Sequence, residues 1–260
     1  MTTAVALTNI VLGTAYTGYG ILTLVDMKRG WKTLGFSHFG AAWVLMAFTC
    51  GPHHLFHGIH VGFEGRPPGG LDLVAVLVGL PVGVIWLLLR VEAFRGGRGD
   101  RFVSGTPMWL HLVPIATAVY VTALVAAALD LPGKQFELPS MMLPNLMLVA
   151  IYVAIGWFLT RTQLRNRPLL GGWSVSGISL AAVFPTCALM HAVWVLYAAT
   201  GVYAFDSHGF VIDWLGVPAG LYFLWVVRGL YLDALRDWNA AQAEAEADEP
   251  VPGTVLVRAG

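Results

Sequence analysis

Long uncharged apolar runs, separated by short loops rich in glycine, proline and arginine, restrict what this chain can fold into. Hydrophobic residues make up 57% of the 260 residues and charged residues 12%, whereas soluble domains average about 45–50% and about 25%. A helix needs about 20 apolar residues to cross a bilayer. Seven runs are long enough: 4–26, 36–62, 71–90, 106–129, 139–161, 173–203 and 209–234. The sequence therefore predicts an all-α membrane protein with seven transmembrane helices. We expect a multi-pass protein of the cell membrane, in contact with the lipid bilayer.

The lysines and arginines lie unequally on the two sides of the predicted bundle. The loops after the first, third and fifth runs carry ten of them, and the opposite loops carry Arg66 and Lys134. Because basic loops stay on the cytoplasmic side, we expect the N-terminus outside and the C-terminus in the cytoplasm. This distribution accounts for most of the basic residues, so nothing indicates a nucleic-acid partner. The ten are Lys28, Arg29, Lys32, Arg90, Arg95, Arg98, Arg101, Arg161, Arg165 and Arg167.

The last three runs repeat the pattern of the first three, at an offset of 136 residues that becomes 137 after the first inner loop. We therefore predict a 3+1+3 internal repeat: 1–104, a linking helix within 105–137, the second repeat at 138–238, and a cytoplasmic tail at 239–260 that we expect to be disordered. A single linking helix makes the two halves parallel, related by a pseudo-twofold axis along the membrane normal. The matching residues are Asn9, Tyr16, Gly20 and Arg29 with Asn145, Tyr152, Gly156 and Arg165, then Ser37, Gly40, Cys50 and His54 with Ser174, Gly177, Cys187 and His191, and Gly79, Pro81 and Gly83 with Gly216, Pro218 and Gly220.

Both cysteines belong to a Cys-x-x-x-His motif, Cys50 with His54 in the second run and Cys187 with His191 in the sixth. A spacing of four residues places the thiol and the imidazole on one helical face, one turn apart, so that both can bind one metal ion. The two cysteines also lie equally far from the start of their runs. Imidazoles and thiols inside a bilayer are costly unless they are paired, which makes such a cluster an indication of function. We expect the four side chains to converge on the pseudo-axis in the outer half of the bilayer.

The type of metal follows from the softness of its ligands. Thiolate and imidazole suit Cu(I) and Zn(II). Met190 takes the position of His53 in the second half, and its thioether favours Cu(I), with zinc as the alternative metal. His57 and His60 lie on the same helical face as Cys50 and His54. Two interpretations of these extra imidazoles remain: a second metal site, or an entry path lined by His53, His57 and His60.

Other chemistries fit parts of this pattern. Haem is an alternative cofactor, with His54 and His191 as its axial ligands. A disulfide between Cys50 and Cys187 is the alternative without a metal. A retinal protein is excluded, because no lysine lies within an apolar run to form the Schiff base.

Two further functions use the histidines differently. A membrane metalloenzyme or oxidase would hold its metal on His53, His57 and His60, with Glu64 as a base. Transport of copper through the bundle would need polar ligands that continue inward, where His38 and His111 are the candidates.

The segment Cys50-Gly-Pro-His-His54-Leu resembles the Cys-Gly-Ala-Thr-His-Leu motif in the copper-bearing transmembrane domain of plant and cyanobacterial ethylene receptors. Phe39-Gly-Ala precedes it in the same run. In the first run Tyr16 follows the polar Asn9 by seven residues, a spacing that also resembles the family. The family has an acid at the position of Asn9. The resemblance covers the first three runs and, more loosely, the last three.

This resemblance implies a three-span domain with its N-terminus outside, here present twice in one chain, and copper ligands at Cys50, His54, Cys187 and His191. It also implies a small neutral ligand that coordinates Cu(I), such as a gas or an alkene, and a cytoplasmic signalling partner. We therefore expect an integral membrane protein that holds Cu(I) between the second and sixth helices and acts as a sensor-like or receptor-like binder. A metalloenzyme and a copper-handling or transport protein are the alternatives.

Overall fold

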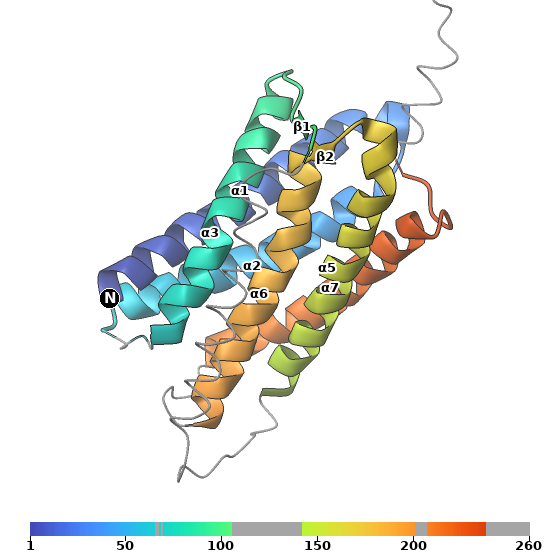
Figure 1. The fold of residues 1–260 in the computed structure, drawn as a ribbon. Coiled ribbons are helices and arrows are strands. Elements are labelled where there is room, and N and C mark those ends of the chain that lie inside the picture. Colours follow the sequence, from blue (N-terminus) through green and yellow to red (C-terminus); the bar gives the residue numbers. More distant parts are fainter. Residues whose placement is uncertain (66–67, 69, 106–141, 201–206, 238–260) are drawn as a thin grey trace, which may run out of the picture.

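The computed structural model describes residues 1–65, 68, 70–105, 142–200 and 207–237. Within these ranges the chain is almost entirely helical (Figure 1). The predicted run at 106–129 lies outside the described residues, as does the predicted tail. The helices are α1 (Thr2–Leu34), α2 (His38–Gly62), α3 (Gly70–Phe94), α5 (Leu143–Leu170), α6 (Val175–Ala199) and α7 (Ser207–Tyr231).

Five of these helices, α1, α3, α5, α6 and α7, are long and apolar enough to cross a membrane. The remaining helix, α2, has 25 residues, which is about 37 Å at the α-helical rise, but its five histidines lower its hydropathy. The protein is thus an all-α, multi-pass membrane protein. The polar stretch of α2 lies inside the bundle, where His54 and His57 are buried.

Several helices extend beyond the apolar runs that predicted them. The α1 helix continues past Asp26, so Lys28 and Lys32 lie on its last turns and not in a loop as expected. Because a helix satisfies its own backbone hydrogen bonds in water and in lipid alike, composition marks the apolar part of a helix rather than its end. Where the predicted runs end, Arg90 of α3 lies beside α1, with Nη2 2.6 Å from Asp26 Oδ2.

Serine caps fix where α2 and α6 begin. Ser37 Oγ accepts a hydrogen bond from the Gly40 N–H at 2.9 Å, and Ser174 Oγ accepts one from the Gly177 N–H at 2.9 Å. Such caps satisfy amide groups that the first helical turn leaves unpaired. Each serine lies 13 residues before the cysteine of its helix, so both thiols stand about 20 Å from the helix start.

The helices form two groups that pack against each other through their second and third members. In the first group α1 contacts α2 and α3, and in the second α5 contacts α6 and α7. Between the groups α2 packs on α7, and α3 packs on α6 (Figure 1). Glycines allow α1 and α2 to approach closely, since a Cβ on Gly13 would lie 2.7 Å from the Gly51 carbonyl oxygen. Two-residue strands, β1 (Phe102–Val103) and β2 (Trp173–Ser174), pair antiparallel beside the start of α6.

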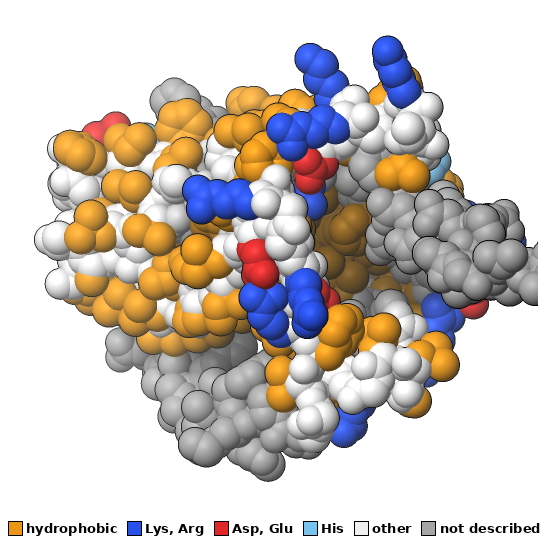
Figure 2. Space-filling view, turned by 90° about the horizontal axis from the view of Figure 1, so that it is seen from above, with side chains coloured by type: hydrophobic (Ala, Val, Ile, Leu, Met, Phe, Trp, Pro, Cys, Tyr) orange, Lys and Arg blue, Asp and Glu red, His pale blue; other side chains and the backbone are white. Residues whose placement is uncertain are grey.

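One end of the bundle is basic: there α1, α3 and α5 end, and α2 and α6 begin. We call this the basic end. Figure 2 shows lysine and arginine side chains around a hollow with a hydrophobic floor. The hollow is a cavity of about 1200 Å³ lined by residues of both groups, among them Arg90, Arg165, Trp43 and Trp86.

An aromatic core separates this hollow from the two cysteines. Trp43 of α2 contacts Trp86 edge-on, with ring centroids 4.1 Å apart, and Phe184 of α6 at 6.2 Å. Phe184 in turn packs on Phe223 of α7 at 5.0 Å. Among the described residues, the polar side chains that carry the predicted chemistry lie beyond this core, towards the opposite end.

Candidate metal site

A small cavity of about 30 Å³ lies between α2 and α6. A cavity needs about 10–15 Å³ to hold one water, so this one has room for roughly two water-sized species. Seven of the eight metal-ligating candidates line it, and His60 lies outside the lining. The seven are Cys50, His53, His54, His57, Cys187, Met190 and His191.

The two motif histidines are held alike, each by an asparagine on the first helix of its own group. His54 Nδ1 lies 2.9 Å from Asn9 Oδ1, and His191 Nδ1 lies 2.6 Å from Asn145 Oδ1. The orientation of both amides is fixed, because Asn9 Nδ2 donates to the Val5 carbonyl and Asn145 Nδ2 donates to a carboxylate. An amide oxygen only accepts hydrogen bonds, so each ring carries its proton on Nδ1.

This tautomer decides which nitrogen is available for chemistry. With Nδ1 protonated, the electron pair of each neutral imidazole is on Nε2, the arrangement found for histidines that bind metals. Both rings are buried and line the same cavity. The asparagines therefore hold both rings in the tautomer that leaves the electron pair on Nε2.

The two thiols are each contacted by a tyrosine from the other half. Cys50 Sγ lies 3.2 Å from Tyr152 Oη, and Cys187 Sγ lies 3.7 Å from Tyr16 Oη. A phenol can donate its proton towards a thiolate and stabilise its charge. Both cysteines are free, so the structure contains no Cys50–Cys187 disulfide.

The tyrosines also reach the histidines. Tyr16 packs edge-on against His54 with ring centroids 5.4 Å apart, and Tyr152 packs against His191 at 5.5 Å. Each tyrosine thus touches the histidine of its own half and the cysteine of the other. The two tyrosines thus connect one Cys-x-x-x-His motif to the other.

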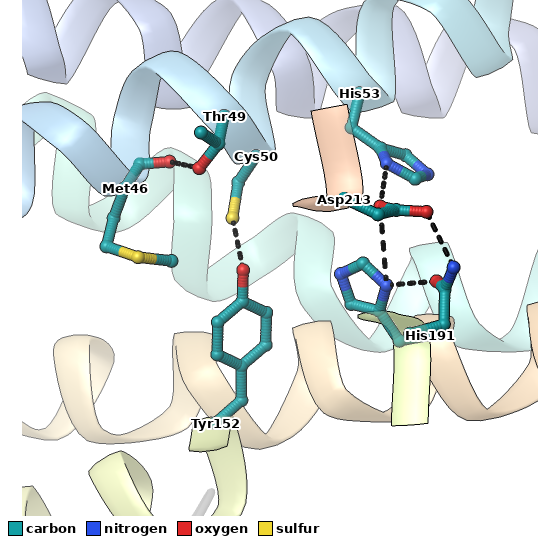
Figure 3. A network of polar contacts seen from close by, with 8 residues as sticks. Met46, Thr49, Cys50, His53, Tyr152, His191 and Asp213 are labelled. Carbon is teal, nitrogen blue, oxygen red and sulfur yellow. Dashed lines mark hydrogen bonds and ion pairs between the residues drawn. The ribbon is translucent and has the colours of Figure 1, made fainter. Parts of the chain in front are cut away.

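Asp213 of α7 belongs to the site, although the sequence analysis did not select it. Its Oδ1 lies 3.0 Å from His53 Nδ1 and 3.9 Å from His191 Nδ1, and its Oδ2 accepts the hydrogen bond from Asn145 (Figure 3). The residue is 2% exposed. An acid inside an apolar run was the available signal, because a carboxylate within a membrane span is costly and so has a partner or a function.

The histidines further along α2 lead towards the opposite end. His57 is buried and lines the cavity, with its ring 5.9 Å from Trp194. His60 stands one turn further, with Nε2 3.5 Å from Oε1 of Glu64, whose side chain is 56% exposed. Glu64 lies beyond the end of α2 and does not line the cavity, so the predicted base is not beside the buried site.

The second half adds a thioether and one aromatic ring to the lining of the cavity. Met190 and Trp194 line the cavity from α6. Tyr197 is turned away from it, because its hydroxyl accepts a hydrogen bond from the Leu71 N–H at 2.8 Å.

His38, at the basic end of α2, has its Nδ1 2.9 Å from Tyr222 Oη of α7. This interhelical hydrogen bond is the structural role expected for an isolated histidine.

In the part of the chain that the structure describes, no group of three or more histidine, cysteine, aspartate or glutamate side chains has an arrangement that could hold a metal ion. The candidate ligands share one cavity but are not gathered as a closed set.

Comparisons with protein-family models, with curated proteins and with solved structures found no match to this chain. What the site can do is therefore argued from its own residues.

Proposed function

We propose that this protein binds Cu(I) in the membrane, between α2 and α6, with Cys50, His54, Cys187 and His191 as its ligands. The observation that carries the proposal is the convergence of both Cys-x-x-x-His motifs on one small cavity. Two further features support it: an asparagine holds Nδ1 of each histidine, and a tyrosine contacts each thiol.

Cu(I) fits this arrangement better than the alternative metal. Zinc and Cu(I) both accept thiolate and imidazole, so these four ligands alone do not separate the two metals. Thiolate together with thioether selects Cu(I). Met190 supplies a thioether in the lining of the same cavity.

Haem fits the cavity poorly. Pockets for ligands of drug size or larger measure roughly 300–1,000 Å³, and the space between His54 and His191 is part of a cavity of about 30 Å³. An ion with a small neutral ligand matches that volume. We therefore propose a sensor-like role, in which a gas or an alkene coordinates the bound Cu(I).

Transport of copper through the bundle is less well supported than binding. A transport route would need ligands between the cysteines and the basic end. Among the described residues, this space is filled by Trp43, Phe184 and Phe223. His38 lies beyond them and is hydrogen-bonded to Tyr222.

We also propose the finer architecture: seven spans in a parallel 3+1+3 repeat, in the cell membrane, with the N-terminus outside and a signalling partner on the cytoplasmic side. Corresponding helix contacts support the repeat, because α1 contacts α2 and α3 as α5 contacts α6 and α7, and the contact of α2 with α7 corresponds to that of α3 with α6. The histidine–asparagine and cysteine–tyrosine contacts recur in the same way. The basic end would face the cytoplasm.

Metal content of the detergent-purified protein tests the proposed site. We expect about one copper per chain, as a single soft site requires, and its loss from the double variant Cys50→Ser/Cys187→Ser. The control is His38→Ala, which removes an imidazole from the same helix but not from the cavity. Zinc retained by the double variant would move the site to the histidines and favour an enzyme. Protein without metal after exposure to Cu(I) would overturn the proposal.

A further inference from the structure

The outer half of α2 carries a series of imidazoles whose burial increases towards the cavity. Glu64 is exposed, His60 is partly buried, and His57 and His54 are buried. His60 and His57 are three residues apart, and so are His57 and His54. At the helical rise each step is about 4.5 Å along the axis.

These side chains share the helical face of Cys50. At 100° per residue, positions 50, 54, 57 and 60 fall within an arc of about 120°. His57 lines the same cavity as Cys50, so the inner half of the series is one continuous space. Only the step from His60 to His57 lies outside that space.

The wall opposite this series is soft and aromatic. Met190 and Trp194 of α6 line the cavity, and the Trp194 ring packs edge-on against His53 at 6.1 Å and His57 at 5.9 Å. Asp72 of α3 adds one carboxylate to the lining. Imidazole, thioether and aromatic groups suit a soft cation and discriminate against the hard cations that prefer oxygen ligands.

We propose that His60, His57 and His54 form an entry route along which Cu(I) passes from the end opposite the basic end to the buried cysteines. This inference rests on the proposed copper site. Glu64 attracts the cation at the opening, where its carboxylate lies 3.5 Å from His60 Nε2. At each step one imidazole nitrogen replaces another on the metal. No electron is transferred, because copper enters and stays as Cu(I), and Cys50 and Cys187 each lose one thiol proton to solvent when they bind it as thiolates.

An entry route predicts an effect on the rate of loading and none on the final occupancy. Metal-free protein is mixed with the Cu(I) complex of bathocuproine disulfonate, and the loss of the coloured complex is followed by stopped flow. In the variant His57→Ala/His60→Ala we expect loading to slow on the order of tenfold, a barrier change of ~1.4 kcal/mol. The copper content at equilibrium and the affinity measured by competition remain those of the wild type.

Two variants keep the test decisive. His60→Ala alone removes a partly buried side chain at the end of the helix, so it should fold and still slow loading. His38→Ala, on the same helix at the basic end, should load at the wild-type rate. Unchanged loading rates in both His60 variants would overturn the route, and so would lower equilibrium occupancy, which would make these histidines ligands. A wild-type protein that takes up no copper would instead overturn the proposed function itself.

Discussion

The two halves of the site hold their histidines by the same contact but anchor that contact differently. In the first half Asn9 holds His54, and the amide of Asn9 donates to the Val5 carbonyl of its own helix. In the second half Asn145 holds His191, but its amide donates to the buried carboxylate of Asp213 on α7. The first arrangement is local to α1 and α2, whereas the second joins three helices.

Asp213 also connects the halves, because its other oxygen lies 3.0 Å from His53 of the first half. At the offset of 137 residues predicted from the sequence, the position of Asp213 corresponds to Val76, a buried apolar residue. The residues that recur are therefore those proposed to bind the metal, and the residue that does not recur links one half to the other. A carboxylate behind Asn145 polarises the contact to His191, which at 2.6 Å is shorter than the 2.9 Å of its counterpart.

The largest expected effect comes from removing this link. Asp213→Ala leaves the Asn145 amide and His53 without the carboxylate, and each buried polar group that loses its partner costs about 1–3 kcal/mol. Thermal denaturation in detergent should show a clearly lower midpoint. Asp213→Asn keeps an acceptor for the amide but loses the charge, so its midpoint should lie between those of wild type and alanine variant. The matched control is Val76→Ala, and a midpoint as low as that of Asp213→Ala would end the distinction between the two positions.

Replacing the asparagines should lower the Cu(I) affinity in both halves, and more in the second half than in the first. Asn9→Ala removes the acceptor that fixes the tautomer of His54, and loss of such a partner costs roughly 10–100-fold in metal affinity. Asn145→Ala should cost more, because Asp213 also loses its hydrogen-bond donor. Competition with a Cu(I) chelator measures both affinities, and Thr8→Ala, next to Asn9 on α1, serves as the control. Equal losses in the two variants would mean that Asp213 does not support His191.

The tyrosines allow a finer test. Tyr152→Phe removes a hydroxyl 3.2 Å from Cys50 Sγ, and Tyr16→Phe removes one 3.7 Å from Cys187 Sγ. A hydrogen bond contributes about 1 kcal/mol, so the Tyr152 variant should lose severalfold in Cu(I) affinity and the Tyr16 variant less. Both variants keep the ring that packs on the histidine. A larger loss at Tyr16 would mean that the shorter distance from Tyr152 to Cys50 does not make it the stronger hydrogen bond.

Most of the described fold follows from the apolar runs, because a chain inside lipid must satisfy its backbone within helices. The predicted run 36–62 and the helix His38–Gly62 differ by two residues at the start. The sequence was less informative about where polar helix ends lie. Nothing in composition stops α1 at Asp26, which pairs with Arg90 at the end of the predicted run, and the helix continues beyond it to Leu34.

The residues of the site were predicted more completely than its connections. A repeated Cys-x-x-x-His motif at equal depth is a local signal, and seven of the eight selected residues line one cavity. The contacts of Tyr16 with Cys187 and of Tyr152 with Cys50 depend on how the halves are set against each other, which spacing within a half does not define. Asp213 was missed because its role depends on α7 packing against α2, although its charge inside an apolar run was visible.

The smallest expected difference concerns the serine caps at the starts of α2 and α6. Ser37→Ala removes one hydrogen bond to the Gly40 amide, and loss of such a cap costs about 1 kcal/mol. Ser174 has a wider set of partners, because its hydroxyl also donates to Asp100 Oδ2 at 2.6 Å and lies 3.2 Å from Ser176 Oγ. Ser174→Ala should therefore lower the midpoint of thermal denaturation further than Ser37→Ala. Both caps lie about 20 Å from the thiols along their helices, so neither variant should change Cu(I) affinity. A loss of affinity in either variant would mean that the start of the helix, and not the packing around the cavity, fixes the position of its cysteine.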